Sequence, residues 1–193
     1  MKRFKGVKGA IVFVILIMLI IAYYFYLSNR SVNEKEKAIS VTAVQSILLD
    51  NLDISYPPSP KEVIKYFCEI TKCFYNEEYT EEELKSLAFK IRELYDADLI
   101  ADKSDEQYLK DLKNDIKTFN QKKITISSYS TSSSSEVEYY AIKGYEFAKL
   151  YCVFTLRQGT ELKFTTEQFL LRKDDKGHWK IYGWELADTN KNE

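Results

Sequence analysis

The chain has 193 residues, and its 28 Lys and Arg side chains nearly balance its 29 Asp and Glu side chains. Five of the cations precede residue 31, so residues 31–193 carry 23 cations against 29 anions. This acidic balance argues against nucleic acid or an anionic lipid surface as the main partner of residues 31–193. The 15 Tyr and 11 Phe argue against a disordered tail.

The first thirty residues have the pattern of an uncleaved membrane anchor. Residues 10–27 form an unbroken apolar run of 18 residues, which spans about 27 Å as a helix, close to the thickness of a bilayer core. A cleaved secretory signal is disfavoured because no A-x-A pattern follows the run. A lipoprotein signal is disfavoured because the first cysteine is Cys68.

The charges that flank this run predict its orientation. Lys2, Arg3, Lys5 and Lys8 precede it, and no acidic residue occurs before Glu34. The positive-inside rule then places the N-terminus in the cytoplasm and residues 31–193 outside. We therefore expect a single-pass protein of the cell membrane, held in the lipid bilayer through residues 9–29, with an extracytoplasmic C-terminal domain.

Helices are predicted first along the chain. Apolar spacing predicts one at residues 38–51, and the proline-rich segment 56–60 ends it. Ser59 or Pro60 should open the next helix. Thr80 and Glu83 match a capping box for a third, with its apolar side extending to Leu94. Ser104 or Asp105 should open a fourth, which runs to about residue 121.

The hydrophobic period then changes from helical to alternating. Strands are expected at residues 123–129, 136–143, 145–157, 162–172 and 178–186, separated by glycine-containing or serine-rich turns. Helices followed by a strand meander indicate an α+β fold, with about three to four helices packed on a curved antiparallel sheet of about five strands.

The expected organisation has five parts. They are a cytoplasmic basic tip (1–8), a transmembrane signal anchor (9–29), a linker with a juxtamembrane helix (30–57), an α+β domain (58–188) and a disordered tail (189–193).

Two resemblances add to this expectation. Residues 169–181, an apolar strand, a polar glycine turn and then Trp-Lys-Ile, are similar to the last hairpin of the cone-shaped nuclear transport factor two-like, or cystatin-like, fold. Residues 56–60, 70–76 and 182–185 resemble an uncharacterised family of membrane-anchored proteins from Gram-positive anaerobes. The first resemblance implies a curved sheet closed by helices around a pocket. The second implies a location and a fold but no activity.

No strong catalytic or metal motif stands out. Enzymes of the resembled fold use an Asp–His or Asp–Tyr pair in the cone, whereas His178, the only histidine, follows a turn glycine and is expected to face solvent. The aspartates at residues 96–105 lack the spacing of a calcium loop and are expected to cap helices. We therefore predict no catalytic residue, no metal and no cofactor.

The three cysteines allow two interpretations. Cys68, Cys73 and Cys152 are expected to be buried free thiols, and a disulfide between Cys152 and either of the other two stays open.

Aromatic residues on the strands are the candidates for a binding surface. Strict alternation places Trp179 and Ile181 on one face of the last strand and Tyr182 and Trp184 on the other. Tyr151, Tyr182 and Trp184 are expected to line a pocket or a partner surface, because Tyr and Trp combine apolar area with a polar group.

The sequence thus predicts a non-catalytic binding or assembly module that holds a protein partner or a small apolar ligand. The alternatives are a hydrolase or isomerase that uses the cone pocket, and a structural component of an envelope or secretion complex.

Overall fold

The computed structural model describes residues 21, 23–24 and 41–187. Of the expected anchor at residues 9–29, only Ile21, Tyr23 and Tyr24 fall within this part, so that prediction lies outside the described residues, as does the tail 189–193. Among the described residues, no helix has both the length and the apolar character needed to cross a membrane.

Five α-helices precede a five-stranded antiparallel sheet in the described part of the chain, which confirms the predicted α+β class. The helices are α2 (Ala43–Leu49), α3 (Pro60–Asn76), α4 (Glu81–Arg92), α5 (Ala97–Ile100) and α6 (Asp105–Lys122). The strands are β1 (Ile124–Thr131), β2 (Glu138–Ile142), β3 (Tyr145–Gln158), β4 (Glu161–Lys173) and β5 (Trp179–Leu186), with a short 3-10 turn, η1 (Ser134–Glu136), before β2.

The predicted starts of α3, α4 and α6 are confirmed by their caps, whereas the helix expected at 38–51 is described only as the shorter α2. Ser59 Oγ accepts from the backbone N–H of Glu62 at the start of α3, and Pro60 occupies a first-turn position where its missing N–H costs nothing. Thr80 and Glu83 form the reciprocal capping box of α4. Ser104 caps α6.

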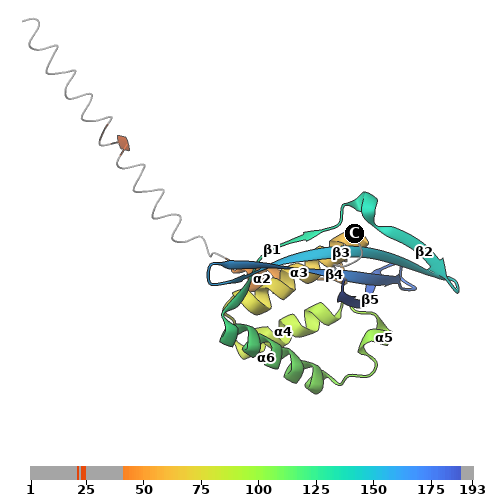
Figure 1. Cartoon of the computed structure of the whole chain (residues 1–193), viewed down its shortest axis with the longest axis horizontal. Helices are drawn as coiled ribbons and strands as arrows, with labels where there is room; N and C mark the ends of the chain where they lie inside the picture. Colours follow the sequence, from red (N-terminus) through yellow and green to blue (C-terminus); the bar gives the residue numbers. More distant parts are fainter. Residues whose placement is uncertain (1–20, 22, 25–40, 188–193) are drawn as a thin grey trace, which may run out of the picture. The chain divides into compact units, whose positions relative to one another are not determined.

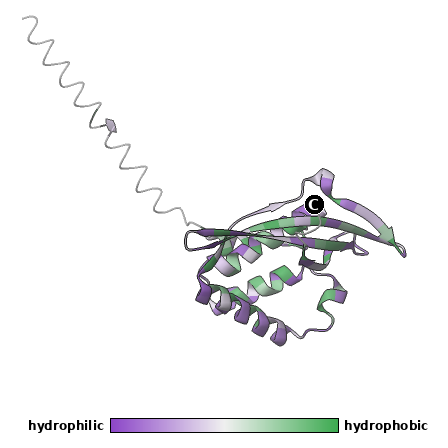
Figure 2. Cartoon of the chain, in the orientation of Figure 1, coloured by the Kyte–Doolittle hydropathy of each residue, from purple (hydrophilic) through white to green (hydrophobic). Residues whose placement is uncertain are grey.

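The sheet has the order β1-β3-β4-β5, and β2 pairs with the first half of β3 on the same edge as β1. Figure 1 shows the sheet as one layer, with α3, α4 and α6 on the same side of it. In Figure 2, hydrophobic residues concentrate in α3 and the central strands, whereas hydrophilic residues are prominent along α6.

The core lies between α3 and the long central strands. Phe67 of α3 meets Phe169 of β4 edge to face at 5.3 Å, and Phe169, Leu150 and Leu171 are fully buried. Trp179 is 7% exposed and Ile181 is fully buried, so the face of the last strand on which both were predicted to lie is a core face.

The segment before α3 belongs to this core, which moves the predicted boundary of the domain. Val44, Ile47 and Leu52 are buried, and the compact unit begins at Thr42 rather than at residue 58. Tyr56 fixes the following turn, because its hydroxyl donates to the carbonyl of Trp179 (2.9 Å) and its ring stacks on His178 (4.3 Å). The part of the predicted linker 30–57 from Thr42 onward is therefore packed structure.

A β-bulge in β5 overturns the predicted faces of that strand. Phe169 pairs with Trp184 and Leu171 pairs with Ile181, so Tyr182 and Gly183 together oppose the single residue Leu170. The extra residue turns Trp184 to the same face as Ile181, toward the helices. The prediction that Tyr182 and Trp184 share a face is wrong.

On both edges of the sheet, a segment outside the sheet forms hydrogen bonds to one residue's backbone. At β5, Ile181 donates to the carbonyl of Leu94 (2.8 Å) and accepts from the N–H of Asp96 (2.9 Å), as in a short parallel bridge. At β1, the Asn76 side chain accepts from the N–H of Ile126 (2.9 Å) and donates to its carbonyl (2.7 Å).

Asp96, which directly follows the residue bridged to β5, forms a buried ion pair. Asp96 is 4% exposed, and it accepts from Arg172 Nε of β4 (2.8 Å) and from a second guanidinium nitrogen. Asp96 also caps α5 by accepting from the N–H of Asp98 (2.9 Å), and the Asp98 carboxylate lies 2.9 Å from Arg172 Nη1. Asp96 therefore has the capping role expected for it, together with an ion pair.

Candidate functional site

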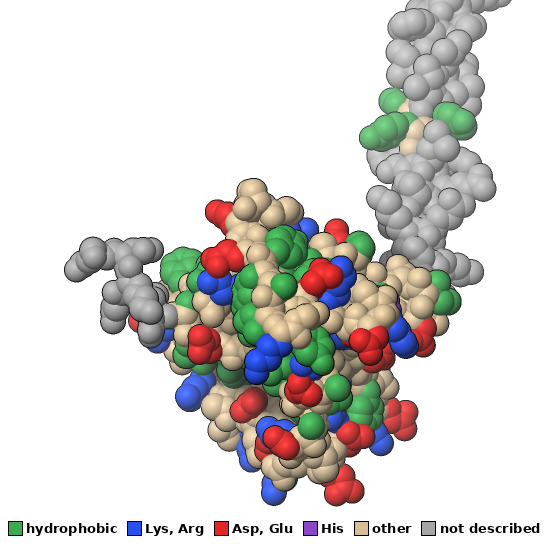
Figure 3. Space-filling view, turned by 90° about the vertical axis from the view of Figure 1, so that its right-hand side faces the viewer, with side chains coloured by type: hydrophobic (Ala, Val, Ile, Leu, Met, Phe, Trp, Pro, Cys, Tyr) green, Lys and Arg blue, Asp and Glu red, His purple; other side chains and the backbone are tan. Residues whose placement is uncertain are grey.

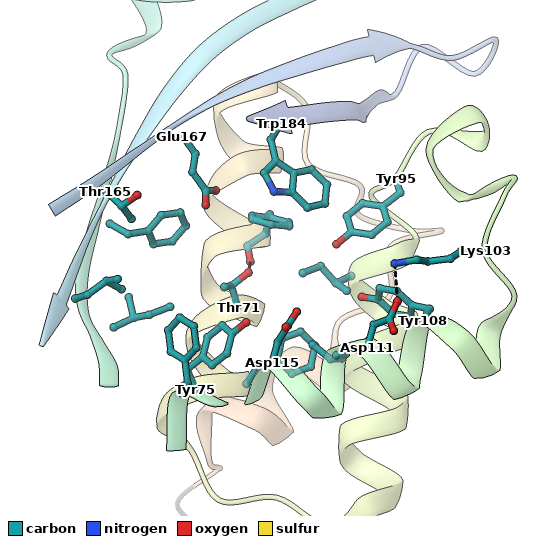
Figure 4. A pocket seen from close by; sticks show the side chains of 18 residues that line it. Thr71, Tyr75, Tyr95, Lys103, Tyr108, Asp111, Asp115, Thr165, Glu167 and Trp184 are labelled. Atoms are coloured by element: carbon teal, nitrogen blue, oxygen red, sulfur yellow. Dashed lines mark hydrogen bonds and ion pairs between the residues drawn. The ribbon is translucent and has the colours of Figure 1, made fainter. Parts of the chain in front are cut away.

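A cavity of about 360 Å³ is lined by residues of α3, α4 and α6 on one side and of the sheet on the other. Its volume lies at the lower end of the range for small-molecule sites. Figure 4 shows side chains from both layers converging on it: Thr71 and Tyr75 from α3, Tyr95 from the turn after α4, and Glu167 and Trp184 from the sheet.

One wall of the cavity is aromatic. Trp184 lies 5.7 Å from Phe67 and 5.7 Å from Tyr95, measured between ring centroids, and Phe67 and Tyr95 are 6.4 Å apart. Three different parts of the chain supply these rings, and the β5 bulge is what brings the third of them inward. All three rings line the cavity, so an occupant would meet aromatic side chains on this side.

Glu167 is the acidic side chain that the sheet contributes to this cavity. Burial raises the pKa of its carboxyl above the ordinary value of 4.5, because the charged form loses hydration. Within residues 41–187, its carboxylate has no hydrogen bond and no ion pair to offset that loss. Figure 4 shows it pointing into the cavity beside Trp184.

The rim of the cavity is polar and comes from α6 and the segment before it. Lys103 Nζ lies 2.7 Å from Asp111 Oδ2, and this contact holds the pKa of the Asp111 carboxyl below its usual range. Asp115 adds a second, exposed carboxylate. Burial raises the pKa of Tyr95 well above its ordinary value, so this phenol stays neutral.

The structure separates the three predicted binding residues. Trp184 lines the cavity. Tyr151 lies on the opposite face of β3, since its neighbours Leu150 and Cys152 are fully buried, and its hydroxyl donates to Gln168 Oε1 (2.9 Å). Tyr182 also faces away from the helices, 4.9 Å under the Arg172 guanidinium.

His178 lies at the β4–β5 turn and does not line the cavity. Its ring is stacked on Tyr56 and is only partly exposed, so the expectation of a solvent-facing side chain holds in part. Its Nδ1 is 3.7 Å from Asp174 Oδ2, and the other Asp174 oxygen accepts from the backbone N–H groups of Lys176 and His178. This arrangement stabilises the turn.

The cysteines are buried free thiols, as expected. Their positions also show which of the two disulfides left open by the sequence could form. Cys68 Sγ of α3 lies 3.4 Å from Cys152 Sγ of β3, whereas Cys73 is buried elsewhere on α3. Cys152 is therefore adjacent to Cys68. The neighbouring thiol and burial raise the pKa of Cys68 far above its ordinary value, so it is unreactive in the folded state.

Refolding under oxidising conditions should join Cys68 to Cys152 and leave Cys73 reduced. The reduced, unfolded chain is refolded in a mixture of reduced and oxidised glutathione, and the disulfide is located by peptide mass mapping. A Cys73→Ser variant should give the same linkage. A disulfide that contains Cys73 would contradict the predicted pairing.

Alternation along β4 is the sequence signal that could have pointed to Glu167. Phe169 and Leu171 point inward at every second position of β4, so Glu167, two residues earlier, is an acidic residue at an inward position. Thr71, Tyr75 and Tyr95 carried no comparable signal, because they reach the cavity only through helix packing.

Chemically, the site combines an aromatic wall, one poorly hydrated carboxyl group and a polar rim. It can enclose a small molecule and contribute a hydrogen bond or a counter-charge at one end. No curated protein matches this sequence. The sequence profile of one family, described as a domain of unknown function (DUF6715), matches residues 1–184, and the chain therefore belongs to that family.

Proposed function

We propose that the chain is a non-catalytic binding module that holds a small molecule between its helices and its sheet. The cavity of about 360 Å³ is the observation that supports this proposal, because Trp184, Glu167 and Thr71 turn toward it from different elements. Closely packed interiors leave few openings of this size, so a lined cavity is the default place for a ligand.

The location we propose is the outer face of a cell membrane. The apolar run at residues 10–27, preceded by four cations, supports a single-pass anchor with the N-terminus in the cytoplasm. The binding module would then be tethered close to the bilayer. The resemblance to membrane-anchored proteins of Gram-positive anaerobes is consistent with this arrangement.

We also assign the module to the nuclear transport factor two-like, cone-shaped type. Three helices on one side of a curved antiparallel sheet, with a cavity between the layers, support this assignment. The type hosts binders, enzymes and assembly modules alike, so it fixes the place of the pocket rather than its chemistry.

A cavity-filling substitution tests the proposal. Thr71→Phe places an aromatic ring in the cavity, where there is room for it, and should abolish retention of a small molecule. Full-length protein, purified without denaturation, is compared with the variant by native mass spectrometry. We expect an additional small mass on the original chain and none on the variant.

Thr118→Phe is the matched control. Thr118 of α6 makes the same type of bond as Thr71, from its hydroxyl to the carbonyl four residues earlier, at 2.9 Å against 2.8 Å, but it is exposed outside the cavity. This control should retain the small mass. Loss of the mass from both variants, or its absence from the original chain, would contradict the proposal.

One observation favours the enzymatic alternative. A carboxyl group with a raised pKa in a cavity is a known form of general acid or base, and Glu167 has that property. A hydrolase or isomerase also needs a second group positioned to share the reacting proton. Within residues 41–187 no hydrogen bond links the Glu167 carboxyl to another titratable side chain, and we therefore favour binding over catalysis.

A second observation favours a role in assembly. The β2–β3 hairpin exposes Tyr139, Tyr140, Ile142 and Tyr145, which are each 39–59% exposed. Figure 3 shows hydrophobic side chains among mixed acidic and basic ones on the side of the molecule that carries this hairpin. Such a surface would suit contact with a protein partner.

A further inference from the structure

We infer that the molecule bound in the cavity is an organic cation, with its positive charge next to Glu167 and its apolar part against the aromatic wall. This inference rests on the proposed binding function and names the chemical class of the ligand. It follows from three features of the described residues: an unpaired carboxylate, the charge balance of the lining, and the chemistry of the wall.

The unpaired carboxylate is the first feature. Proteins that bury an acidic group normally supply a cation or several hydrogen-bond donors, as Asp96 illustrates in this fold with the Arg172 guanidinium. Glu167 is only partly buried, but within residues 41–187 it has neither a cation nor a hydrogen-bond donor as a partner, and its side chain is turned into the cavity (Figure 4). A ligand that carries a positive charge would supply the missing partner.

The charge balance of the lining points the same way. Of the residues that line the cavity, Glu167, Asp111 and Asp115 are acidic, and Lys103 is the single basic one. The Lys103 ammonium lies 2.7 Å from the Asp111 carboxylate, which offsets its charge. A carboxylate or phosphate ligand would face an excess of negative charge, whereas a cation is attracted.

The aromatic wall also favours a cationic ligand. The faces of Trp184, Tyr95 and Phe67 carry the negative part of the ring quadrupole, which attracts ammonium groups and their methyl or methylene substituents. The β4 strand places Glu167 two residues before Phe169, and Phe169 pairs with Trp184 across the β4–β5 ladder. The carboxylate and the wall are thus neighbours on one face of the sheet.

These features together favour an amine or a quaternary ammonium compound over a neutral apolar molecule. A neutral molecule would satisfy the wall but leave the carboxylate without a partner. A small metal ion would satisfy the carboxylate but leave the aromatic wall unused, and within the described residues no group of three or more His, Cys, Asp or Glu side chains is placed to hold one.

The test compares two probes of the same shape, choline and its neutral isostere 3,3-dimethylbutan-1-ol. Their affinities for the full-length chain are measured by ligand-observed nuclear magnetic resonance, with the Thr71→Phe variant as the blank for binding outside the cavity. We expect choline to bind at least about tenfold more tightly than the neutral alcohol, as a cation–π contact combined with a counter-ion implies.

Glu167→Gln should remove this preference while keeping the shape of the side chain. Glu161→Gln on the same strand is the matched control, because its carboxylate is exposed and lies outside the cavity, and it should leave the preference unchanged. Thermal unfolding of both variants verifies that they are folded.

The outcomes separate this inference from the proposed function. Equal affinity for the two probes, or a preference for choline that survives in Glu167→Gln, overturns the cationic ligand but leaves a small-molecule cavity intact. Failure of both probes to bind also overturns it, and the native mass spectrum of the original chain then decides independently whether the cavity holds a ligand of another class.

Discussion

Replacing Asp96 with alanine is expected to lower the free energy of unfolding by about 3–5 kcal/mol, because it leaves a mostly buried guanidinium without its main partner. The Arg172 side chain is 18% exposed and makes two bonds to the Asp96 carboxylate. Those bonds also raise the pKa of Arg172 above its ordinary value, so the charge persists. Urea unfolding of the full-length variant measures the loss.

Asp98→Ala is the matched control for this experiment. Asp98 contacts the same guanidinium at 2.9 Å, but its side chain is 61% exposed, and solvent screening limits such a pair to about 1 kcal/mol or less. The double variant Asp96→Ala with Arg172→Met should cost less than the sum of the two single changes, since neither charge is then left alone. Equal losses for Asp96→Ala and Asp98→Ala would refute the role given to the buried pair.

Replacing Phe169 with alanine is expected to cost about 3–5 kcal/mol of unfolding free energy, since it deletes a fully buried ring at the centre of the core. The ring contacts Phe67 at 5.3 Å and stacks near Trp184 at 6.1 Å, so it joins α3 to the aromatic wall. The loss combines the transfer free energy of the ring with the cost of the space left behind. The midpoint of urea unfolding should fall accordingly.

Phe164 provides the control on the same strand. Its side chain is 72% exposed, so Phe164→Ala should change the unfolding free energy by no more than about 0.5 kcal/mol. The two substitutions remove the same atoms and differ only in burial. If they destabilise the chain equally, the core is not centred on Phe169.

Local signals explain why most of the elements could be predicted from the sequence. The caps at Ser59, Thr80 and Ser104 depend on residues within three positions of each other. Strand alternation and turn glycines are equally local, and the five predicted strands match β1–β5 to within a few residues. The boundary at Thr42 was missed because the proline-rich segment between α2 and α3 resembles a linker.

The site could be predicted only in part, because it depends on contacts between distant segments. Trp184 was predicted to be a binding residue, but strict alternation placed it on the wrong face of β5. The bulge that changes its face has no strong sequence signal. Tyr151 and Tyr182 are of the same residue type as the tyrosines that line the cavity, yet they lie on the other face of the sheet. The Asp96–Arg172 pair joins residues 76 positions apart, which spacing cannot reveal.

The hydrogen-bond partners at the two edges of the sheet also bear on how the chain behaves at high concentration. Unpaired edge strands invite strands of other molecules and so promote aggregation. Here the Asn76 amide occupies both backbone groups of Ile126 on the outer side of β1, and the chain at Leu94–Asp96 occupies those of Ile181 on β5. A strand from another molecule would have to displace these partners before it could pair along the first half of β1 or of β5, so this part of each edge is protected against self-association.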